Sequence, residues 1–276
     1  MEPEFFMNRY KELLKDKFKD LPKYISKTLT PSIRINTLKI EEKDLIKRLE
    51  KRGIKLEKIK FLKYGYRATA KFSLGSTQEY LQGYYYIQEA ATQLPAEILD
   101  SKPNELILDC CAAPGGKLTQ LSQLMKNKGI VIGLDIKDDR LKALKNNIER
   151  MGITNSVIYK KDLRDVQDLN LKFDKILLDA PCSGNFMIDK SWFQKRDLEG
   201  IKRNAELQKK LLKSALSVLK DNGVLVYSTC SLEPEENEEV INWAKDNINI
   251  KVEEQKRLWP HIDNTQGFFL AKIIKE

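Results

Sequence analysis

From about residue 105 to the end of the chain, two kinds of segment follow one another. Short apolar runs are separated by segments whose apolar residues recur at helical spacing. The apolar runs predict strands and the intervening segments predict helices, and strands that alternate with helices are typical of a parallel, doubly wound α/β sheet. The pattern predicts strands at 105–110, 129–136, 157–162, 175–180, 223–229 and 267–274, and helices at 117–127, 138–151, about 197–220 and 235–247.

The first hundred residues have a different pattern, which predicts a small α/β unit. A strand, a helix that stops at Gly53 and a second strand follow one another closely. A tyrosine-rich segment then leads to the turn SKPNE, before which we place the domain boundary. We therefore expect a basic N-terminal domain over residues 1–100 and a larger domain over residues 101–276. The smaller domain is expected to contain a helix at 4–20, a strand at 32–40, a helix at 41–53, a strand at 55–62 and the tyrosine-rich bridge at 80–90.

The composition predicts a folded, cytoplasmic protein. The 276 residues are enough to bury a core, and 41% of them are hydrophobic and 32% are charged. The N-terminus is too charged for a signal peptide, and no apolar run approaches the roughly 18 residues of a membrane span. The four cysteines lack CxxC spacing, which argues against a zinc site or a disulfide framework and favours a reducing compartment. We therefore expect no metal and no membrane, and the sequence indicates no obligate protein partner.

The positive charge is concentrated near the N-terminus. Residues 9–71 contain 20 Lys and Arg against 8 Asp and Glu, a net charge of +12, whereas the whole chain carries +9. A basic segment beside a nearly neutral one favours a polyanionic partner, usually a nucleic acid. A lysine-rich surface that contacts only water explains the charge equally well, so charge alone leaves both interpretations open.

A glycine-rich loop, AAPGGK, follows the first strand of the larger domain and opens its helix. Its glycines allow a ligand to approach the backbone, and the helix N-terminus favours negative charge. A P-loop is excluded, because Cys111 stands where its first glycine belongs and Leu118 where its Ser or Thr belongs. The dinucleotide fingerprint GxGxxG is absent, but Asp135 ends the next strand, where a carboxylate accepts both ribose hydroxyls. A nucleoside without an obligatory pyrophosphate fits this pattern, as in S-adenosylmethionine.

Two further acids at strand ends are candidates for ligand contacts. Asp162 follows the third strand, where it can accept the amino group of an adenine, and Asp179 follows the fourth, where it can bind an exocyclic amine or a protonated ring nitrogen. A structural interpretation stays open for the loop and for two of the acids: Gly115 and Gly116 make a tight turn, and Asp135 and Asp162 cap the segments that follow. It is weaker for Asp179, because an unpaired charge after the apolar run KILLDA is costly.

Two cysteines are candidate nucleophiles, because each follows a strand in a loop of small, polar residues. Cys182 lies in PCSG and Cys230 in TCS, at strand ends that a parallel sheet brings to one edge. A thiolate near a cation has a lowered pKa, and Lys117 is a candidate cation. Cys110 lies within a strand and is expected to be a buried apolar residue, and His261 is the only histidine, so a Cys–His dyad is not indicated. The residues alone do not decide which of the two thiols is the nucleophile.

Several motifs in a fixed order give the chain a resemblance to a known family. DCCAAPGGK, GLDI, KKDLRD, LLDAPCSG and YSTCSLEPEENE, with the lead-in GYYYIQEAATQLP, resemble the RNA 5-methylcytosine methyltransferases of the Sun type. The resemblance covers about residues 80–276, and RINT at 34–37 resembles the N-terminal region of that family. The short N-terminal part and the lack of a further RNA-binding domain resemble the compact archaeal tRNA enzymes most.

The resemblance implies a fold, a cofactor and a reaction. The fold is the methyltransferase variant of the Rossmann sheet with its last strand inserted antiparallel, and the cofactor is S-adenosylmethionine. The substrate is RNA, with tRNA as the expected class, and it receives a methyl group on carbon 5 of a cytosine. Cys230 is implied to add to carbon 6, because a thiolate there makes carbon 5 reactive. Cys182 is implied to assist release, and Asp179 to steady ring nitrogen 3 and the amino group.

The resemblance also implies contacts to the cofactor. The loop at 111–117 holds the methionine end and the ribose, Asp135 holds the ribose hydroxyls, and Asp162 holds the adenine. Arg140 and Asp179 also match positions near the cofactor. The predicted catalytic residues are Cys230, Cys182, Asp179 and Lys117, and the predicted cofactor-binding residues are Cys111, Ala112, Ala113, Pro114, Gly115, Gly116, Lys117, Asp135, Arg140, Asp162 and Asp179.

Three other functions stay open at this point. An rRNA 5-methylcytosine methyltransferase would have the same motifs. A catalytically silent RNA-binding scaffold would be marked by loss of Cys230 or of AAPGGK, and both are intact. A uracil-5 or DNA methyltransferase would be separated by the identity of the methylated nucleoside, and in DNA 5-methylcytosine enzymes the cysteine of the PC motif is the nucleophile instead.

Overall fold

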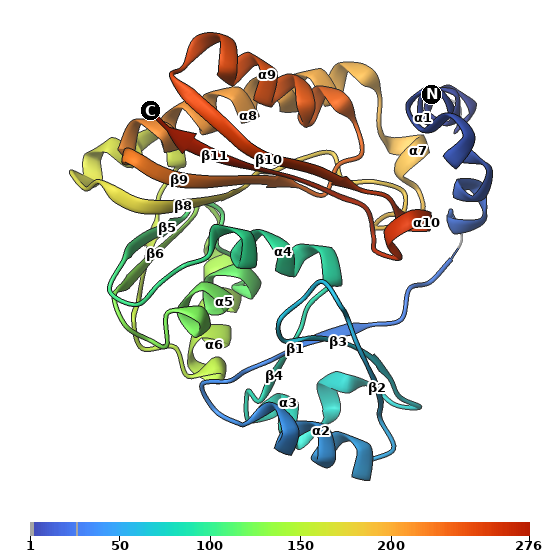
Figure 1. The fold of residues 1–276 in the computed structure, drawn as a ribbon, viewed down its shortest axis with the longest axis vertical. Coiled ribbons are helices and arrows are strands. Elements are labelled where there is room, and N and C mark those ends of the chain that lie inside the picture. The colour runs from blue at the N-terminus through green and yellow to red at the C-terminus, as the bar shows by residue number, and fades with distance from the viewer. Residues whose placement is uncertain (1–2, 26) are drawn as a thin grey trace.

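Seven strands form the sheet that carries the candidate site (Figure 1). The structure, a computed structural model, describes residues 3–25 and 27–276. The strands are β5 (Leu106–Asp109), β6 (Ile130–Asp135), β7 (Ser156–Lys160), β8 (Phe173–Asp179), β9 (Leu219–Thr229), β10 (Ile250–Leu258) and β11 (Phe268–Lys275). Their order is β10-β11-β9-β8-β5-β6-β7, and the five from β9 to β7 in this order are parallel. The predicted α/β class with a Rossmann-like sheet is therefore confirmed.

The last strand of the chain has the antiparallel position that the resemblance implies. β11 lies between β9 and β10 and runs antiparallel to both, with Ala271 opposite Tyr227 on one side and Gln255 on the other. The sequence pattern does not predict β10. This edge strand carries mostly exposed polar side chains, as in EEQKR, so it lacks the apolar positions by which a strand is recognised.

Helices cover both faces of the large sheet (Figure 1). On one face lie α8 (Leu198–Val218) and α9 (Glu238–Asn247), and on the other lie α4 (Ala90–Leu99), α5 (Gly116–Leu124) and α6 (Asp138–Met151). Because successive strand residues point to opposite faces, Leu108 packs with α8 and α9 whereas Ile107 packs with α4, α5 and α6. Among the described residues, no helix combines the length and the apolar character needed to cross a membrane.

Short helical segments connect these elements. Four of them lie in the large domain, and η2 lies in the small one. The segments are η2 (Leu74–Ser76), η3 (Leu163–Leu169), α7 (Trp192–Lys195), η4 (Pro234–Glu236) and α10 (Pro260–Asp263).

A four-stranded antiparallel sheet forms the small domain, at the lower end of Figure 1. Its first strand ends earlier than predicted, at Ile35, because the buried Asn36 turns its side chain to the carbonyl oxygens of Gly83 and Met151, each at 2.8 Å. β3 and β4 were not predicted as strands, since such short runs show little alternation. The elements are β1 (Ser32–Ile35), α2 (Glu42–Lys51), β2 (Lys55–Lys58), β3 (Gly65–Thr69), α3 (Gln78–Leu81) and β4 (Tyr85–Ile87), with strand order β2-β3-β1-β4.

The N-terminal helix packs against the large domain, beside α7 and α10 (Figure 1). α1 (Pro3–Leu14) is shorter than the predicted helix at 4–20, because Lys15 adopts a left-handed φ of +50° and the 3₁₀ helix η1 (Lys15–Tyr24) follows. Its buried aromatic residues join a cluster of the large domain. The cluster contains Phe6, Tyr10, Phe186, Trp192, Phe193 and Trp259. The division of the chain at residue 100 stays a prediction, and α1 contributes to the core that lies beyond it.

Candidate active site

The glycine-rich loop connects β5 to α5 and requires glycine at one position. Gly115 has a φ of +111°, which other residues rarely adopt, and a Cβ there would lie 3.0 Å from Cδ1 of Leu144. Asn147 of α6 donates to the carbonyl oxygen of Pro114 at 2.9 Å, so α6 fixes the position of the loop. α5 begins at Gly116, and its first N–H groups are therefore available to a ligand.

A cavity of about 310 Å³ lies at the carboxyl ends of the parallel strands. A second hollow adjoins it, and the two share Cys111 and Asp179. Every predicted site residue except Gly115, which faces α6, lines one of the two. The cavity contains Cys111, Asp135, Arg140, Asp162, Asp179, Cys182 and Cys230, and the hollow contains Cys111, Ala112, Ala113, Pro114, Gly116, Lys117 and Asp179.

Asp135 is a buried carboxylate at the end of β6, and one of its oxygens accepts no hydrogen bond from the described residues. The backbone N–H of Lys137 donates to its Oδ1 at 3.0 Å. Arg140 lies 3.1 Å from Oδ2 as an ion pair and also donates to the carbonyl oxygen of Ala113. Oδ2 nevertheless accepts no hydrogen bond from any described residue, because the guanidinium approaches it without hydrogen-bond geometry. This oxygen is available to a hydroxyl group of a ligand.

Asp162 caps the segment that follows it and lines the cavity as well. Its Oδ1 accepts the backbone N–H of Arg164 at 2.9 Å, and the Arg164 side chain binds both carboxylate oxygens. These hydrogen bonds lower the pKa of Asp162. The capping interpretation and the ligand interpretation of this residue are therefore compatible.

Asp179 and Lys117 form an ion pair across the two hollows. Lys117 Nζ lies 2.7 Å from Asp179 Oδ2, and the hydroxyl of Ser228 donates to Oδ1 at 2.8 Å. Burial is the largest single influence and lowers the pKa of Lys117, but the charge and hydrogen bond of Asp179, together with smaller contributions from Asp109 and Cys230, raise it overall. The charge of Asp179, in the run KILLDA, is thus paired, and Asp179 also lines the cavity.

The two candidate nucleophiles meet at one wall of the cavity. Sγ of Cys182 lies 3.0 Å from Sγ of Cys230, and either thiol can be the donor. The hydrogen bond with Cys230, followed by burial, raises the pKa of Cys182 well above its usual value. The two thiols are therefore close enough for one to donate a hydrogen bond to the other.

The other cysteines and the histidine differ in their surroundings. Cys110 is buried at 3% exposure, which confirms that it is a core residue, and burial raises its pKa. Burial also raises the pKa of Cys111, which lines the cavity as a neutral thiol. His261 contacts the carbonyl oxygen of Lys17 at 2.7 Å, near the N-terminal segment.

Asp109 is a buried acid that the sequence analysis missed. It ends β5, it is fully buried, and neither of its carboxylate oxygens has a hydrogen-bonded side-chain partner among the described residues. Burial raises its pKa to about 7, against the influence of Lys117. The signal was present, because Asp109 ends a strand as Asp135, Asp162 and Asp179 end or follow theirs.

Arg34 of RINT joins the small domain to the cofactor loop. Its guanidinium is 1% exposed and donates to the carbonyl oxygen of Gly116, to Thr119 Oγ1 at 2.8 Å and to Gln88. Burial lowers the pKa of Arg34 to about 9. The sequence indicated RINT only through the family resemblance. The contacts of Arg34 could not be predicted from it, because their acceptors lie in α5 and next to β4, far along the chain.

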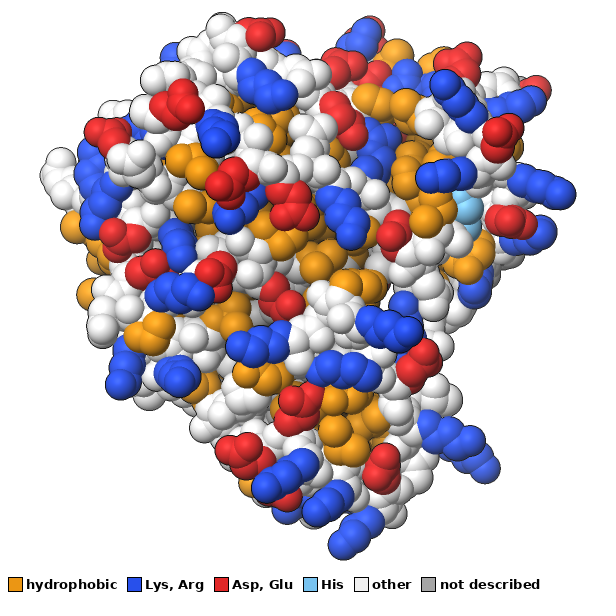
Figure 2. All heavy atoms as spheres, in the orientation of Figure 1, with side chains coloured by type: hydrophobic (Ala, Val, Ile, Leu, Met, Phe, Trp, Pro, Cys, Tyr) orange, Lys and Arg blue, Asp and Glu red, His pale blue; other side chains and the backbone are white. Residues whose placement is uncertain are grey.

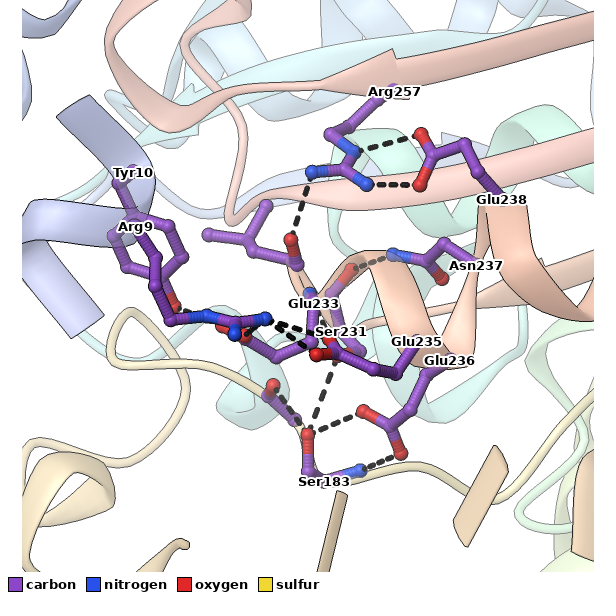
Figure 3. A network of polar contacts seen from close by, with 12 residues as sticks. Arg9, Tyr10, Ser183, Ser231, Glu233, Glu235, Glu236, Asn237, Glu238 and Arg257 are labelled. Carbon is purple, nitrogen blue, oxygen red and sulfur yellow. Dashed lines mark hydrogen bonds and ion pairs between the residues drawn. The ribbon is translucent and has the colours of Figure 1, made fainter. Parts of the chain in front are cut away.

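A polar network lies behind the thiol loops (Figure 3), and its centre is Glu236. The carboxylate accepts the backbone N–H of Ser183 at 2.8 Å and also the Ser183 hydroxyl. Gln208 of α8 donates to Glu236 at 3.2 Å and to the carbonyl oxygen of Pro181 at 2.9 Å. Glu236 therefore holds the loop that contains Cys182.

Asn237 has the matching function for the other loop. Its Nδ2 donates to the carbonyl oxygen of Ser231 at 3.0 Å, and its Oδ1 accepts the hydroxyl of Thr229. These two partners flank Cys230. Adjacent residues of the EENE sequence thus hold the two thiol loops against each other, which the sequence analysis did not foresee.

α1 closes the outer side of this network (Figure 3). Arg9 binds both carboxylate oxygens of Glu235 at 2.7 Å and lies 3.2 Å from Glu233, while Tyr10 donates to Glu233 at 2.6 Å. Burial raises the pKa of Glu233 to about 7. The N-terminal helix therefore supports the segment that carries Glu236 and Asn237.

Two family profiles match the chain. The profile described as 16S rRNA methyltransferase RsmB/F matches residues 96–274, which is more than half of the chain. The profile described as the N-terminal domain of 16S rRNA methyltransferase RsmF matches residues 3–90.

Curated relatives share more than a third of their aligned residues with the chain. The 28S rRNA (cytosine-C(5))-methyltransferase of Mus musculus is 38% identical over 276 residues, an alignment that covers 88% of this chain and 35% of the relative. The ribosomal RNA small subunit methyltransferase F of Shewanella piezotolerans is 38% identical over 283 residues, covering 93% and 60%. The chain thus spans about a third of the length of the mouse relative and 60% of the length of the bacterial one.

Solved structures from Pyrococcus horikoshii have the same fold over the full chain. A methyltransferase homologue is 39% identical with a TM-score of 0.91, covering 100% of this chain and 96% of the other. NSun6, solved with SFG, is 27% identical with a TM-score of 0.89, covering 98% and 97%. The Sun-type resemblance of the motifs is thereby confirmed, and the chain belongs to the RsmB/F methyltransferase family.

Proposed function

We propose that this chain transfers a methyl group from S-adenosylmethionine to carbon 5 of a cytosine in RNA. The observation that carries the proposal is the pair of thiols, 3.0 Å apart, in the wall of a cavity that also contains the three strand-end acids Asp135, Asp162 and Asp179. The two mammalian relatives, which are named rRNA cytosine-C5 methyltransferases, support the same reaction. An intact site of this kind gives no support to a silent scaffold.

The cavity suits the proposed cofactor. Asp135 has a buried oxygen without a hydrogen-bond donor, as a ribose hydroxyl would require. Asp162 would hold the adenine, and the loop at 111–117 would hold the methionine end, with Arg140 and Asp179 beside it. When bound, S-adenosylmethionine supplies an electrophilic methyl group.

The chain's own residues prepare the cytosine. In the proposed reaction the Cys230 thiolate adds to carbon 6, and the electron pair displaced from the C5–C6 double bond makes carbon 5 nucleophilic. Asp179 would steady the ring at nitrogen 3 and the amino group. For release, a base removes the proton from carbon 5, the C6–S bond breaks, and its electron pair returns to Cys230. Cys182 assists that release.

The RNA class has two candidates. The expected substrate is tRNA, on the resemblance of the motifs to those of the archaeal tRNA enzymes. The names of the curated relatives favour rRNA as the alternative.

We propose that the basic N-terminal region contributes much of the RNA affinity. Lys and Arg side chains project from the small domain at the lower end of Figure 2, interspersed with fewer acids. Arg52 and Lys58 are paired with Glu79 and Glu42. The other cations of the segment 51–60, namely Lys51, Lys55 and Lys60, are exposed. These three lysines are the candidates for phosphate contacts.

Incubation with labelled S-adenosylmethionine and total RNA tests the reaction. We expect label in 5-methylcytidine, and mapping of the labelled nucleotide assigns it to tRNA or to rRNA. Label in 5-methyluridine, or in DNA rather than RNA, would contradict the proposal.

The roles of the two thiols are tested by Cys230→Ala and Cys182→Ala. Cys230→Ala should abolish turnover and the covalent adduct with RNA, because the nucleophile is gone. Cys182→Ala should accumulate the adduct, because release is impaired. Denaturing gels of each variant with RNA and S-adenosylmethionine show the adduct, and a stable adduct in Cys230→Ala with none in Cys182→Ala would reverse the assignment.

The cofactor site is tested by Asp135→Ala. Loss of hydrogen bonds to a charged acceptor costs about 1.5–3 kcal/mol each, so the affinity for S-adenosylhomocysteine should fall at least about tenfold. Calorimetry measures this affinity. Asp139→Ala is the matched control, because it removes an exposed carboxylate at the start of α6, the helix that follows β6. Equal affinities of the Asp135 variant and the unmodified chain would remove this residue from the site.

The RNA surface is tested by replacing Lys51, Lys55 and Lys60 together with Ala. Each neutralised phosphate releases counterions, so the variant should bind tRNA more weakly and with a flatter salt dependence. Its affinity for S-adenosylhomocysteine should stay the same, because the loop at 111–117 lies in the large domain. A control variant lacks Lys245, Lys251 and Lys256, three exposed lysines of α9 and β10. If filter binding shows the same affinity and slope for the test variant as for the unmodified chain, the RNA surface lies elsewhere.

A further inference from the structure

Glu236 differs from its neighbours in having no cation beside it. Glu233 and Glu235 are paired with Arg9, and Glu238 is paired with Arg257. No ion pair among the described residues includes Glu236, although the residue is fully buried. A buried carboxylate without a counter-ion is costly, so its retention calls for a reason other than packing.

The donors that hold Glu236 tie its charge to the Cys182 loop. They are the backbone N–H and hydroxyl of Ser183 and the side-chain amide of Gln208, all of them neutral. Each of these three hydrogen bonds is donated to the carboxylate. Ser183 directly follows Cys182, and Gln208 also binds the carbonyl oxygen of Pro181, which directly precedes it. The negative charge is therefore held at both flanks of one thiol.

The two thiols have different surroundings. After the hydrogen bond to Cys230 and burial, the charges of Cys230 and Glu236 raise the pKa of Cys182 further. Lys117, whose Nζ lies 2.7 Å from Asp179, lines the hollow that adjoins the cavity of Cys230. An anion thus stands behind Cys182, whereas the cation Lys117 is paired with Asp179 next to the cavity.

Other charged and titratable groups also lie around Cys182. Tyr227 of β9 donates its hydroxyl to the carbonyl oxygen of Glu236, and burial raises its pKa well above the usual value, so it stays neutral. Arg196, directly after α7, donates to the carbonyl oxygen of Ser183 at 3.1 Å, so a cation also borders the Cys182 loop. The other titratable residues that line the cavity with the two thiols are Cys111, Asp135, Arg140, Lys161, Asp162, Arg164 and Asp179.

We propose that Glu236 is a positioning residue that keeps the proton on Cys182 and so leaves the thiolate to Cys230. This inference rests on the proposed function, in which Cys230 is the nucleophile. Ser183 and Gln208 hold the Glu236 carboxylate at the Cys182 loop, and its charge acts on the thiol. The S–H of Cys182 donates to Sγ of Cys230, which stabilises the thiolate before it adds to cytosine. The same donation assists release, when the electron pair of the C6–S bond returns to Cys230 and the proton stays on Cys182.

The test is the pH dependence of alkylation of Cys182 by iodoacetamide, in which the thiolate displaces iodide. Cys230→Ala serves as the background, so that the second thiol neither competes nor donates, and peptide mass spectrometry reports Cys182 alone. Glu236→Gln keeps the shape and one acceptor oxygen for Ser183 N–H and Gln208 but removes the charge, and its amide nitrogen donates to the Ser183 hydroxyl instead of accepting from it. Glu236→Asp keeps the charge but shortens the side chain. Glu239→Gln makes the same charge change at an exposed position of α9 and is the matched control.

We expect Glu236→Gln to lower the midpoint for Cys182 by about one pH unit or more, so that alkylation below the midpoint is about tenfold faster. Glu236→Asp and Glu239→Gln should leave the pH midpoint of Cys182 within about 0.3 units of its value in the Cys230→Ala background, which is small against the one unit that corresponds to a tenfold change. An unchanged midpoint in Glu236→Gln would overturn the proposal. An equal fall in the Gln and Asp variants would also overturn it, since it would show that side-chain geometry, not charge, matters.

Two features keep the outcome decisive. Cys110 is buried, so its alkylation reports unfolding. If Cys110 becomes alkylated in Glu236→Gln, the folded Glu236→Asp variant is used instead. A pH midpoint for Cys182 that is about one unit lower in Glu236→Asp would contradict the proposal. The measurement uses neither RNA nor S-adenosylmethionine. A failure of RNA methylation would therefore contradict the proposed function without altering the titration, and an unchanged titration would contradict only the role of Glu236.

Discussion

The parallel pairing of β8 with β9 is the constraint on which the site depends. In this register Asp179 lies opposite Ser228, whose hydroxyl donates to it at 2.8 Å. Both strands leave the sheet at the same level, so the loops that follow bring Cys182 and Cys230 together. A slip of one residue would turn each side chain to the opposite face and separate the thiols from the acid that lies beside them.

Buried polar contacts then hold the loops in place from two sides. Glu236 and Asn237 bind the loops of the two thiols, and α1 supports their segment through Arg9 and Tyr10. On the other side of the cavity, Arg34 of the small domain binds the start of α5. The cofactor loop and the thiol loops thus depend on two segments within the first 35 residues, and α1 and β1 act on different parts of the large domain.

The predictability of the fold varies with burial. The parallel strands and the helices α6, α8 and α9 carry clear apolar periods, because both faces of the sheet are covered. β10 is an exposed edge strand with few apolar residues, and its sequence shows no such period. α1 ended early for a local reason, the left-handed conformation of Lys15, which its side chain does not signal.

The sequence by itself determined the alternation of parallel strands and helices in the large domain and the loops at the strand ends, and with them most of the residues that meet in the cavity, because hydrophobic period and glycine position are local properties. Only the tertiary structure decided which charges are paired. Ser183 reaches Glu236 across 53 residues of chain, and Arg34 reaches Gly116 across 82. Since burial and hydrogen-bond partners come from such distant segments, the isolated charge of Glu236 and the free oxygens of Asp109 become visible only when the chain is folded.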